Sequence, residues 1–192
     1  PLYQRSLAIL EKALGPTHPD VVKSLNNLAA LYVATGEYAK AKPLHQRSIA
    51  VLEKALGHDH PDVATSLNTL AGLYRETGEY AKAEPLHQRS LVILEKALGP
   101  DHPDVVKSLN NLAGLYTTTG EYAKAAPLHQ RSLAVLEKAL GPDHPDVATS
   151  LTNLALVHAA ARRYDEAKVL HKRALAIYEK TLGLEHPDVA MS

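Results

Sequence analysis

The stretch LNNLAALYVATGEYAKA, Leu25–Ala41, contains the pattern from which the fold can be predicted. Its first half spaces four apolar residues i, i+3, i+4 and i+7, so that they share one helix face: Leu25, Leu28, Ala29 and Tyr32. Gly36 then interrupts the pattern and indicates a tight turn. The same spacing resumes at Tyr38 and continues to Leu56. We therefore predict a helix over 19–34 (helix A) and a second over 37–56 (helix B).

The pattern returns every 42 residues. The units are 24–65, 66–107, 108–149 and 150–191, and the second and third share 34 of their 42 positions. Residues 1–23 match a helix B with its following connection, and the chain ends on the start of a next helix A. One helix pair cannot bury its apolar face alone, but stacked pairs can. We expect a single all-α solenoid over 1–192, cut from a longer chain.

The connection between units carries a stop signal followed by a start signal. It has the sequence LGPDHPDV at 98–105 and at 140–147, and LGHDHPDV at 56–63. Gly57 follows helix B and can adopt a positive φ, as a helix-ending glycine does. Pro61 suits the first turn of helix A, and Asp62 places a negative charge near the positive end of its dipole.

Composition excludes several classes of function. The 21 basic and 21 acidic side chains give a formal net charge of zero, which argues against a nucleic-acid partner. The chain has no cysteine, and no apolar run approaches the ~20 residues of a membrane span. It has no phosphate-binding, dinucleotide-binding or HExxH motif. The recurring serines are periodic, whereas a catalytic triad is a singular feature: Ser24, Ser66, Ser108 and Ser150. We expect no enzymatic activity and no cofactor.

Histidines recur in two sets. One lies in the connections and the other in helix B: His18, His60, His102, His144 and His186; His45, His87, His129 and His171. A metal site needs several ligands that converge on one point, and one histidine per unit does not supply them. We expect packing, with a hydrogen bond within the connection, and no resident metal. An adventitious surface metal at His58–His60 is the alternative.

Helix A also has a face of small and polar residues. At 100° per residue, it lies opposite the apolar stripe. In the first unit this face contains Asn26, Asn27 and Ala30. Side-chain amides pair well with peptide groups because they both donate and accept hydrogen bonds. The candidate binding residues are Lys23, Asn26, Asn27, Thr65, Asn68, Arg75, Lys107, Asn110, Asn111, Thr149 and Asn153.

The stretch NLAGLYTTTGEYAKA, Asn111–Ala125, resembles a tetratricopeptide repeat (TPR). The matching positions are Leu109, Leu112, Ala113, Tyr116, Gly120, Tyr122 and Ala125. The 42-residue period, with the strings SLNNLA and HPDVA, resembles the kinesin light chain type of this array. The resemblance implies a right-handed superhelix of antiparallel helix pairs. It also implies that helices A line a concave groove, in a cytoplasmic protein that binds other proteins.

The last unit departs from the pattern. His158, Arg162 and Val169 replace the tyrosine, glycine and proline of the other units, so we expect this unit to be less regular or to lie near a natural end of the array. The prolines of the others lie inside helix B and are expected to bend it: Pro43, Pro85 and Pro127.

Two functions fit these observations. The first is a protein-interaction module that binds an extended peptide along helices A. Lys23, Arg75 and Lys107 favour an acidic peptide there. The alternative is a structural spacer or a duplicated or engineered scaffold with no ligand, in which the asparagines are solvated or bond neighbouring helices. The apolar face of Leu2–Leu14 would lie open in either case, so we also expect end-to-end self-association.

Overall fold

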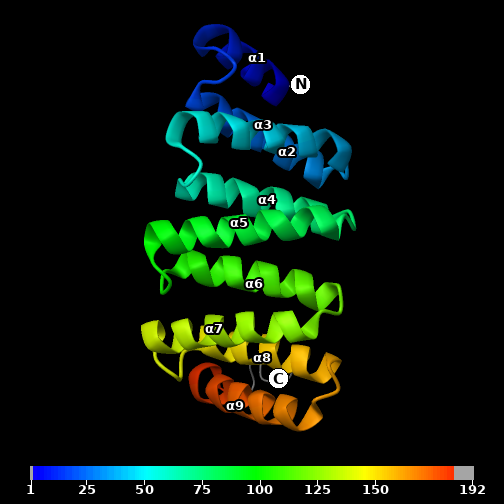
Figure 1. Cartoon of the computed structure of the whole chain (residues 1–192), viewed down its shortest axis with the longest axis vertical. Coiled ribbons are helices and arrows are strands. Elements are labelled where there is room, and N and C mark those ends of the chain that lie inside the picture. Colours follow the sequence, from blue (N-terminus) through cyan, green and yellow to red (C-terminus); the bar gives the residue numbers. More distant parts are fainter. Residues whose placement is uncertain (1, 184–192) are drawn as a thin grey trace. The chain divides into compact units, whose positions relative to one another are not determined.

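The computed structural model describes residues 2–183, and these form nine α-helices and no strand. Contacts divide the described chain into two units, 2–100 and 101–183. Unit 1 contains α1 (Leu2–Leu14), α2 (Pro19–Ala34), α3 (Tyr38–Leu56), α4 (Pro61–Glu76) and α5 (Tyr80–Leu98). Unit 2 contains α6 (Pro103–Thr118), α7 (Tyr122–Leu140), α8 (Pro145–Ala160) and α9 (Tyr164–Leu182), as Figure 1 shows.

The predicted elements are confirmed. Helix A over 19–34 coincides with α2, and helix B over 37–56 is α3, which begins one residue later at Tyr38. Helices A are α2, α4, α6 and α8, and helices B are α1, α3, α5, α7 and α9. The all-α class of stacked helix pairs is confirmed. A single solenoid over the whole chain remains a prediction, and His186 and the start of a next helix A lie outside the described residues.

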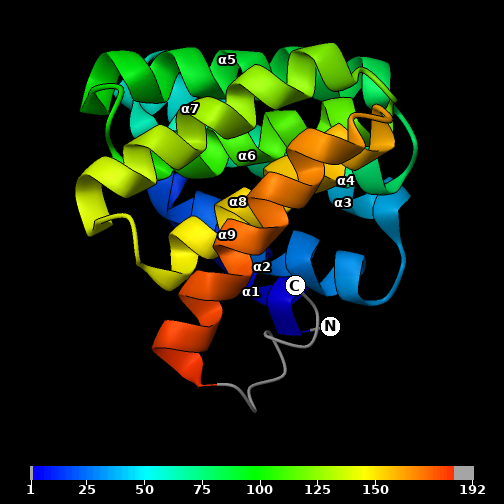
Figure 2. The ribbon, with the colours of Figure 1, turned by 90° about the horizontal axis from the view of Figure 1, so that it is seen from below.

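The core of each unit lies between neighbouring helices in chain order. In unit 1, α2 packs on α3, α3 on α4 and α4 on α5. In unit 2, α6 packs on α7, α7 on α8 and α8 on α9; Figure 2 shows the last pair crossing side by side. The predicted stripe is buried at Leu25, Leu28 and Ala29. The predicted helix B stripe ends before Leu56, whose side chain is 42% exposed and does not join the core.

The connections are built as the sequence indicates. Gly57 has φ 90° and ψ 161°, a conformation open essentially to glycine alone. Pro61 opens α4, and Asp62 lies in its first turn. The histidine before each of these prolines is the N-cap: its Nδ1 accepts a hydrogen bond from the backbone N–H two residues later, over 3.1–3.2 Å, at His18, His60, His102 and His144. The expected local hydrogen bond of these histidines is therefore confirmed.

The last repeat is irregular at the turn between α8 and α9. Arg162 has φ 61°, in the left-handed region that glycine occupies at the equivalent Gly36, Gly78 and Gly120. His158 is buried in the place of tyrosines whose hydroxyls accept a hydrogen bond from the preceding helix B, as Tyr74 does from Gln46 over 3.0 Å. Helices α3, α5 and α7 run continuously through their prolines.

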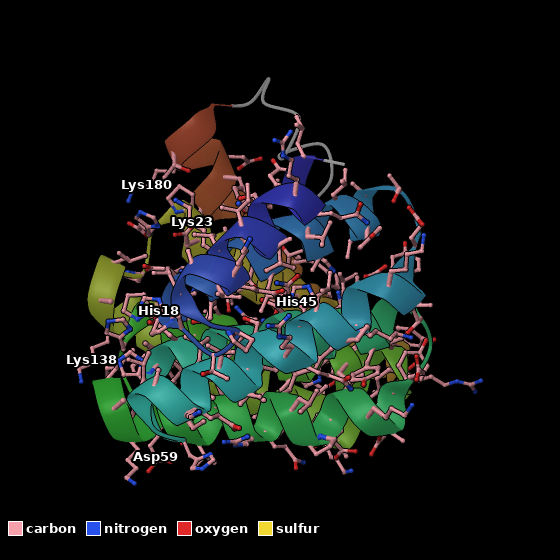
Figure 3. All side chains as sticks on the ribbon, turned by 90° about the horizontal axis from the view of Figure 1, so that it is seen from above. His18, Lys23, His45, Asp59, Lys138 and Lys180 are labelled. Atoms are coloured by element: carbon pink, nitrogen blue, oxygen red, sulfur yellow. The ribbon has the colours of Figure 1, made fainter. Side chains whose placement is uncertain are left out.

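Two rows of ion pairs join successive repeats within the units. In one row an arginine of helix B contacts a glutamate of the preceding helix B: Arg47–Glu11, Arg89–Glu53 and Arg173–Glu137. In the other, a lysine near the end of helix B contacts an aspartate of the preceding connection: Lys96–Asp59, Lys138–Asp101 and Lys180–Asp143. Figure 3 labels three of these residues, Asp59, Lys138 and Lys180.

Candidate binding groove

All eleven predicted binding residues lie on helices A. In unit 1 they belong to α2 and α4: Lys23, Asn26, Asn27, Thr65, Asn68 and Arg75. In unit 2 they belong to α6 and α8: Lys107, Asn110, Asn111, Thr149 and Asn153. The asparagines other than Asn27 are half-buried, whereas Lys23, Lys107 and both threonines are exposed. Figure 3 shows Lys23 on the surface of unit 1.

A cavity of about 430 Å³ lies between α2 and α4 in unit 1. Two predicted residues, Asn26 and Thr65, line it. His45 lies on α3 and contributes to the wall from helix B (Figure 3). The remaining lining is small or moderately apolar: Ala30, Val33, Ala34, Ser66 and Thr69.

A second cavity, of about 280 Å³, lies between α6 and α8 in unit 2. Four predicted residues line it: Lys107, Asn110, Thr149 and Asn153. Apolar side chains and two further polar ones complete the lining: Pro103, Val106, Leu136, Asp146 and Ser150. Four equivalent positions of the repeat line both cavities, namely those of Asn110, Thr149, Ser150 and Asn153. A concave site between successive helices A is thus a property of each unit.

Helix B histidines orient two of the groove asparagines. His87 Nδ1 lies 2.7 Å from Asn68 Oδ1, and His129 Nδ1 lies 3.3 Å from Asn110 Oδ1. An amide oxygen only accepts, so the histidine must donate through a protonated Nδ1. Sequence reasoning treated these histidines as packing residues. The spacing of 19 residues from asparagine to histidine is the signal that it did not use.

Burial keeps these imidazoles neutral. Burial, followed by the positive charge of Arg75, lowers the pKa of His87 from 6.5 to about 4. Burial also lowers the pKa of His45 and of His129. Since His87 donates through Nδ1, its buried Nε2 is left as a lone pair without a partner. The asparagine oxygen is therefore held toward a neutral histidine, and the amide N–H groups are what Asn110 can offer to the cavity that it lines.

The last repeat lacks this pair. Thr152 stands at the position of Asn110, and its hydroxyl donates to the Ala148 carbonyl over 3.1 Å. The corresponding histidine, His171, has a buried Nδ1 with no hydrogen-bond partner. The departure therefore changes the polar wall of this repeat as well as its turn.

Two of the cations predicted to attract an acidic ligand have carboxylate neighbours. Lys107 Nζ lies 2.9 Å from Asp104 Oδ1, and an Arg75 nitrogen lies 3.5 Å from Glu76 Oε1. Asp146 also lines the cavity of unit 2. Local positive charge is thus smaller than the sequence suggests, and the predicted preference for an acidic ligand depends mainly on Lys23.

The described residues contain neither a metal-binding cluster nor a membrane-spanning helix. Among residues 2–183, no three histidine, aspartate or glutamate side chains gather closely enough to form a metal site. In the same part of the chain, no helix combines the length and the hydropathy that crossing a bilayer requires.

The chain was compared with known proteins. The family model described as tetratricopeptide repeat matches residues 1–54, 24–96, 62–138, 108–180 and 146–192. A search among curated proteins found no match.

Several solved structures are similar. A Podosopora anserina putative kinesin light chain with nearly identical TPR-like repeats is 30% identical, with a TM-score of 0.84 over 94% of this chain and 85% of that one. BtubC (BKLC) from P. vanneervenii is 26% identical, with a TM-score of 0.83 over 97% and 74%. The apo form of RapI, at 17% identity and a TM-score of 0.78 over 93% and 62%, shares the fold. The repeats match the family model along the entire sequence, and the chain belongs to the tetratricopeptide repeat family.

Proposed function

We propose that this chain is a protein-interaction module whose helices A bind an extended segment of a partner protein. Tetratricopeptide repeats commonly serve as such modules. The observation that carries the proposal is the pair of cavities between successive helices A, at equivalent positions of the repeat in both units. Each is lined by amide and hydroxyl groups that can pair with a peptide backbone.

The ligand is a peptide or protein in a cytoplasmic setting, and no nucleic acid, metal or catalytic step takes part. The preference for acidic segments belongs to unit 1, where Lys23 is exposed. The salt dependence of peptide binding tests this preference. Attraction between exposed charges is screened at high ionic strength, so a preference that depends on Lys23 should weaken there.

Binding of a peptide library by the Asn26→Ala and Asn153→Ala variants tests the proposal. Both residues line a cavity and neither bonds a helix B histidine. We expect each change to weaken binding by about five- to tenfold, as the loss of one hydrogen bond does. Lys54→Ala is the control, since Lys54 is exposed at the end of helix B. Unchanged binding in both asparagine variants would contradict the groove.

End-to-end self-association is a second proposal. The exposed side chains of α1 include the apolar Leu2, Ile9 and Leu14. Sedimentation of the wild type beside Ile9→Lys tests it. A concentration-dependent dimer that the variant abolishes is expected, and a monomer at every concentration would refute it.

A spacer with no ligand is the competing function. It predicts that no peptide of any composition shifts the amide signals of α2, α4, α6 or α8, even at millimolar concentration, where binding is worth roughly 4 kcal/mol.

A further inference from the structure

The cavity between α6 and α8 contains a buried hydroxyl with no partner. Ser150 is 2% exposed, lines this cavity, and its Oγ makes no hydrogen bond. A buried hydroxyl in this state is unfavourable, because it has lost water and gained nothing in return. A ligand that enters the cavity can supply the missing partner.

The cavity has room for one side chain of a bound segment. Its volume is about 280 Å³, whereas an apolar cavity of about 150 Å³ already holds a benzene molecule. Pro103, Val106 and Leu136 give it apolar walls. These walls suit the methylene stem of a side chain, and the polar groups suit its tip.

The polar groups specify what the tip must carry. The oxygen of Asn110 is engaged by His129, so its amide group offers donors. Ser150 Oγ can accept as well as donate, and Asn153 adds a second amide. A complementary group needs an acceptor for Asn110 and a donor for Ser150. A carboxylate has no donor, and an ammonium or guanidinium has no acceptor.

Charge points to the same group. The lining contains one ammonium and one carboxylate, Lys107 and Asp146, and Lys107 is already paired with Asp104. An anionic side chain would lose its hydration here without gaining an unengaged counter-ion. A cationic one could meet only Asp146, whose side chain is 64% exposed, so that solvent would screen the pair. An uncharged tip with both a donor and an acceptor avoids that loss.

We propose that this cavity is a specificity pocket for a glutamine side chain of the bound segment. The carboxamide oxygen accepts from Asn110, its NH₂ donates to Ser150 Oγ, and its two methylenes lie against Val106 and Leu136. The inference rests on the proposed peptide-binding function and adds the side chain that unit 2 selects. In unit 1, Thr69 replaces Asn153 and donates to the Thr65 carbonyl over 3.0 Å, so that cavity lacks the second amide.

Titration of the full chain with end-blocked alanine peptides tests the pocket. The central residue is glutamine, glutamate, lysine or methionine, which have similar lengths. Amide signals of the Asn110 and Asn153 side chains and of the Ser150 backbone report occupancy. We expect the glutamine peptide to bind about five- to tenfold more tightly than the other three, because each of them lacks at least one of its two hydrogen bonds.

Ser150→Ala should remove most of that preference. The matched control is Ser132→Ala, because Ser132 Oγ is also buried without a partner but lies on α7 and does not line the cavity. The control should bind like the wild type. A Ser150→Ala variant that keeps the glutamine preference would overturn the pocket.

The outcomes separate the two proposals. Peptides that all bind, with shifts on helices A but no preference for glutamine, would refute the pocket and leave the groove. Peptides that all fail to bind at any concentration would refute both. A preference for glutamate with the same shifts would also refute the pocket and would support the acidic preference.

Discussion

At the residue scale, the turn after α8 places an arginine where the other repeats have glycine. Arg162 has φ 61°, and its Cβ makes this conformation unfavourable by about 1–2 kcal/mol. The strain persists because the flanking helices fix the turn. Arg162 is exposed, so its side chain can be changed without disturbing the core.

Arg162→Gly should therefore stabilise the chain by about 0.5–1 kcal/mol, the relief of strain less the entropy that glycine adds to the unfolded state. Urea unfolding measures the change. Arg162→Ala is the control, since it removes the charge and keeps the strain. Equal stability of the two variants would show that the guanidinium, and not the backbone, sets the effect.

His87 makes stability depend on pH. Its pKa is about 4 in the folded chain against 6.5 when unperturbed, so the unfolded chain binds more protons between these values. The stability contributed by the neutral imidazole is complete above pH 6.5 and is lost as pH falls toward 4. The loss is of the order of 2–3 kcal/mol. Unfolding at successive pH values should show this slope. His87→Gln should reduce it and leave the part that comes from His45 and His129, whose pKa values burial also lowers. An unchanged slope in this variant would show that His87 is not its cause.

At the element scale, the pairing of α8 with α9 lacks a hydrogen bond that α4 and α5 possess. His171 Nδ1 is buried without a partner because Thr152 bonds its own helix. Thr152→Asn places an amide oxygen at the position from which Asn68 accepts a hydrogen bond from His87. We expect a gain of about 1 kcal/mol in the free energy of unfolding. Thr152→Val, which removes the hydroxyl and adds no acceptor, serves as the control. If both variants gain equally, the histidine pair is not the cause.

The lysine–aspartate row is incomplete at the first connection. Thr17 stands where Asp59, Asp101 and Asp143 stand later, and Lys54 stands where Lys96 does. Thr17→Asp should add an exposed ion pair worth about 0.2–0.5 kcal/mol, which high salt removes. Unfolding at low and high ionic strength measures it, with Thr17→Asn as the uncharged control. A gain that survives high salt would argue for a better turn instead of an ion pair.

At the scale of the whole molecule, stability is expected to be local because helices pack mainly on their neighbours in chain order. Leu25 in α2 is fully buried. Leu25→Ala should cost about 3 kcal/mol and raise amide exchange most in α1, α2 and α3, and less in α5. Hydrogen exchange helix by helix measures this. A uniform rise across α1–α5 would show that unit 1 opens as one body.

The sequence predicts the fold well because each element is encoded locally and repeated. Apolar spacing sets α2 and α3, Gly57 sets the end of α3, and Pro61 sets the start of α4. The groove face also follows from helix geometry. The partners of its asparagines do not, because the Asn68–His87 contact depends on how two helices cross. The unpartnered Ser150 hydroxyl is equally invisible to periodicity, since all four recurring serines share one position in the repeat.

The two ion-pair rows bear on how such a gene changes length. A repeat that takes part in both rows supplies cations that contact the repeat before it and carboxylates that contact the repeat after it. As far as these ion pairs are concerned, any one of these repeats therefore matches any other. Recombination between neighbouring repeats that adds or deletes 42 codons would bring the same charged partners together at the new junction, so the ion pairs would form again in an array of different length.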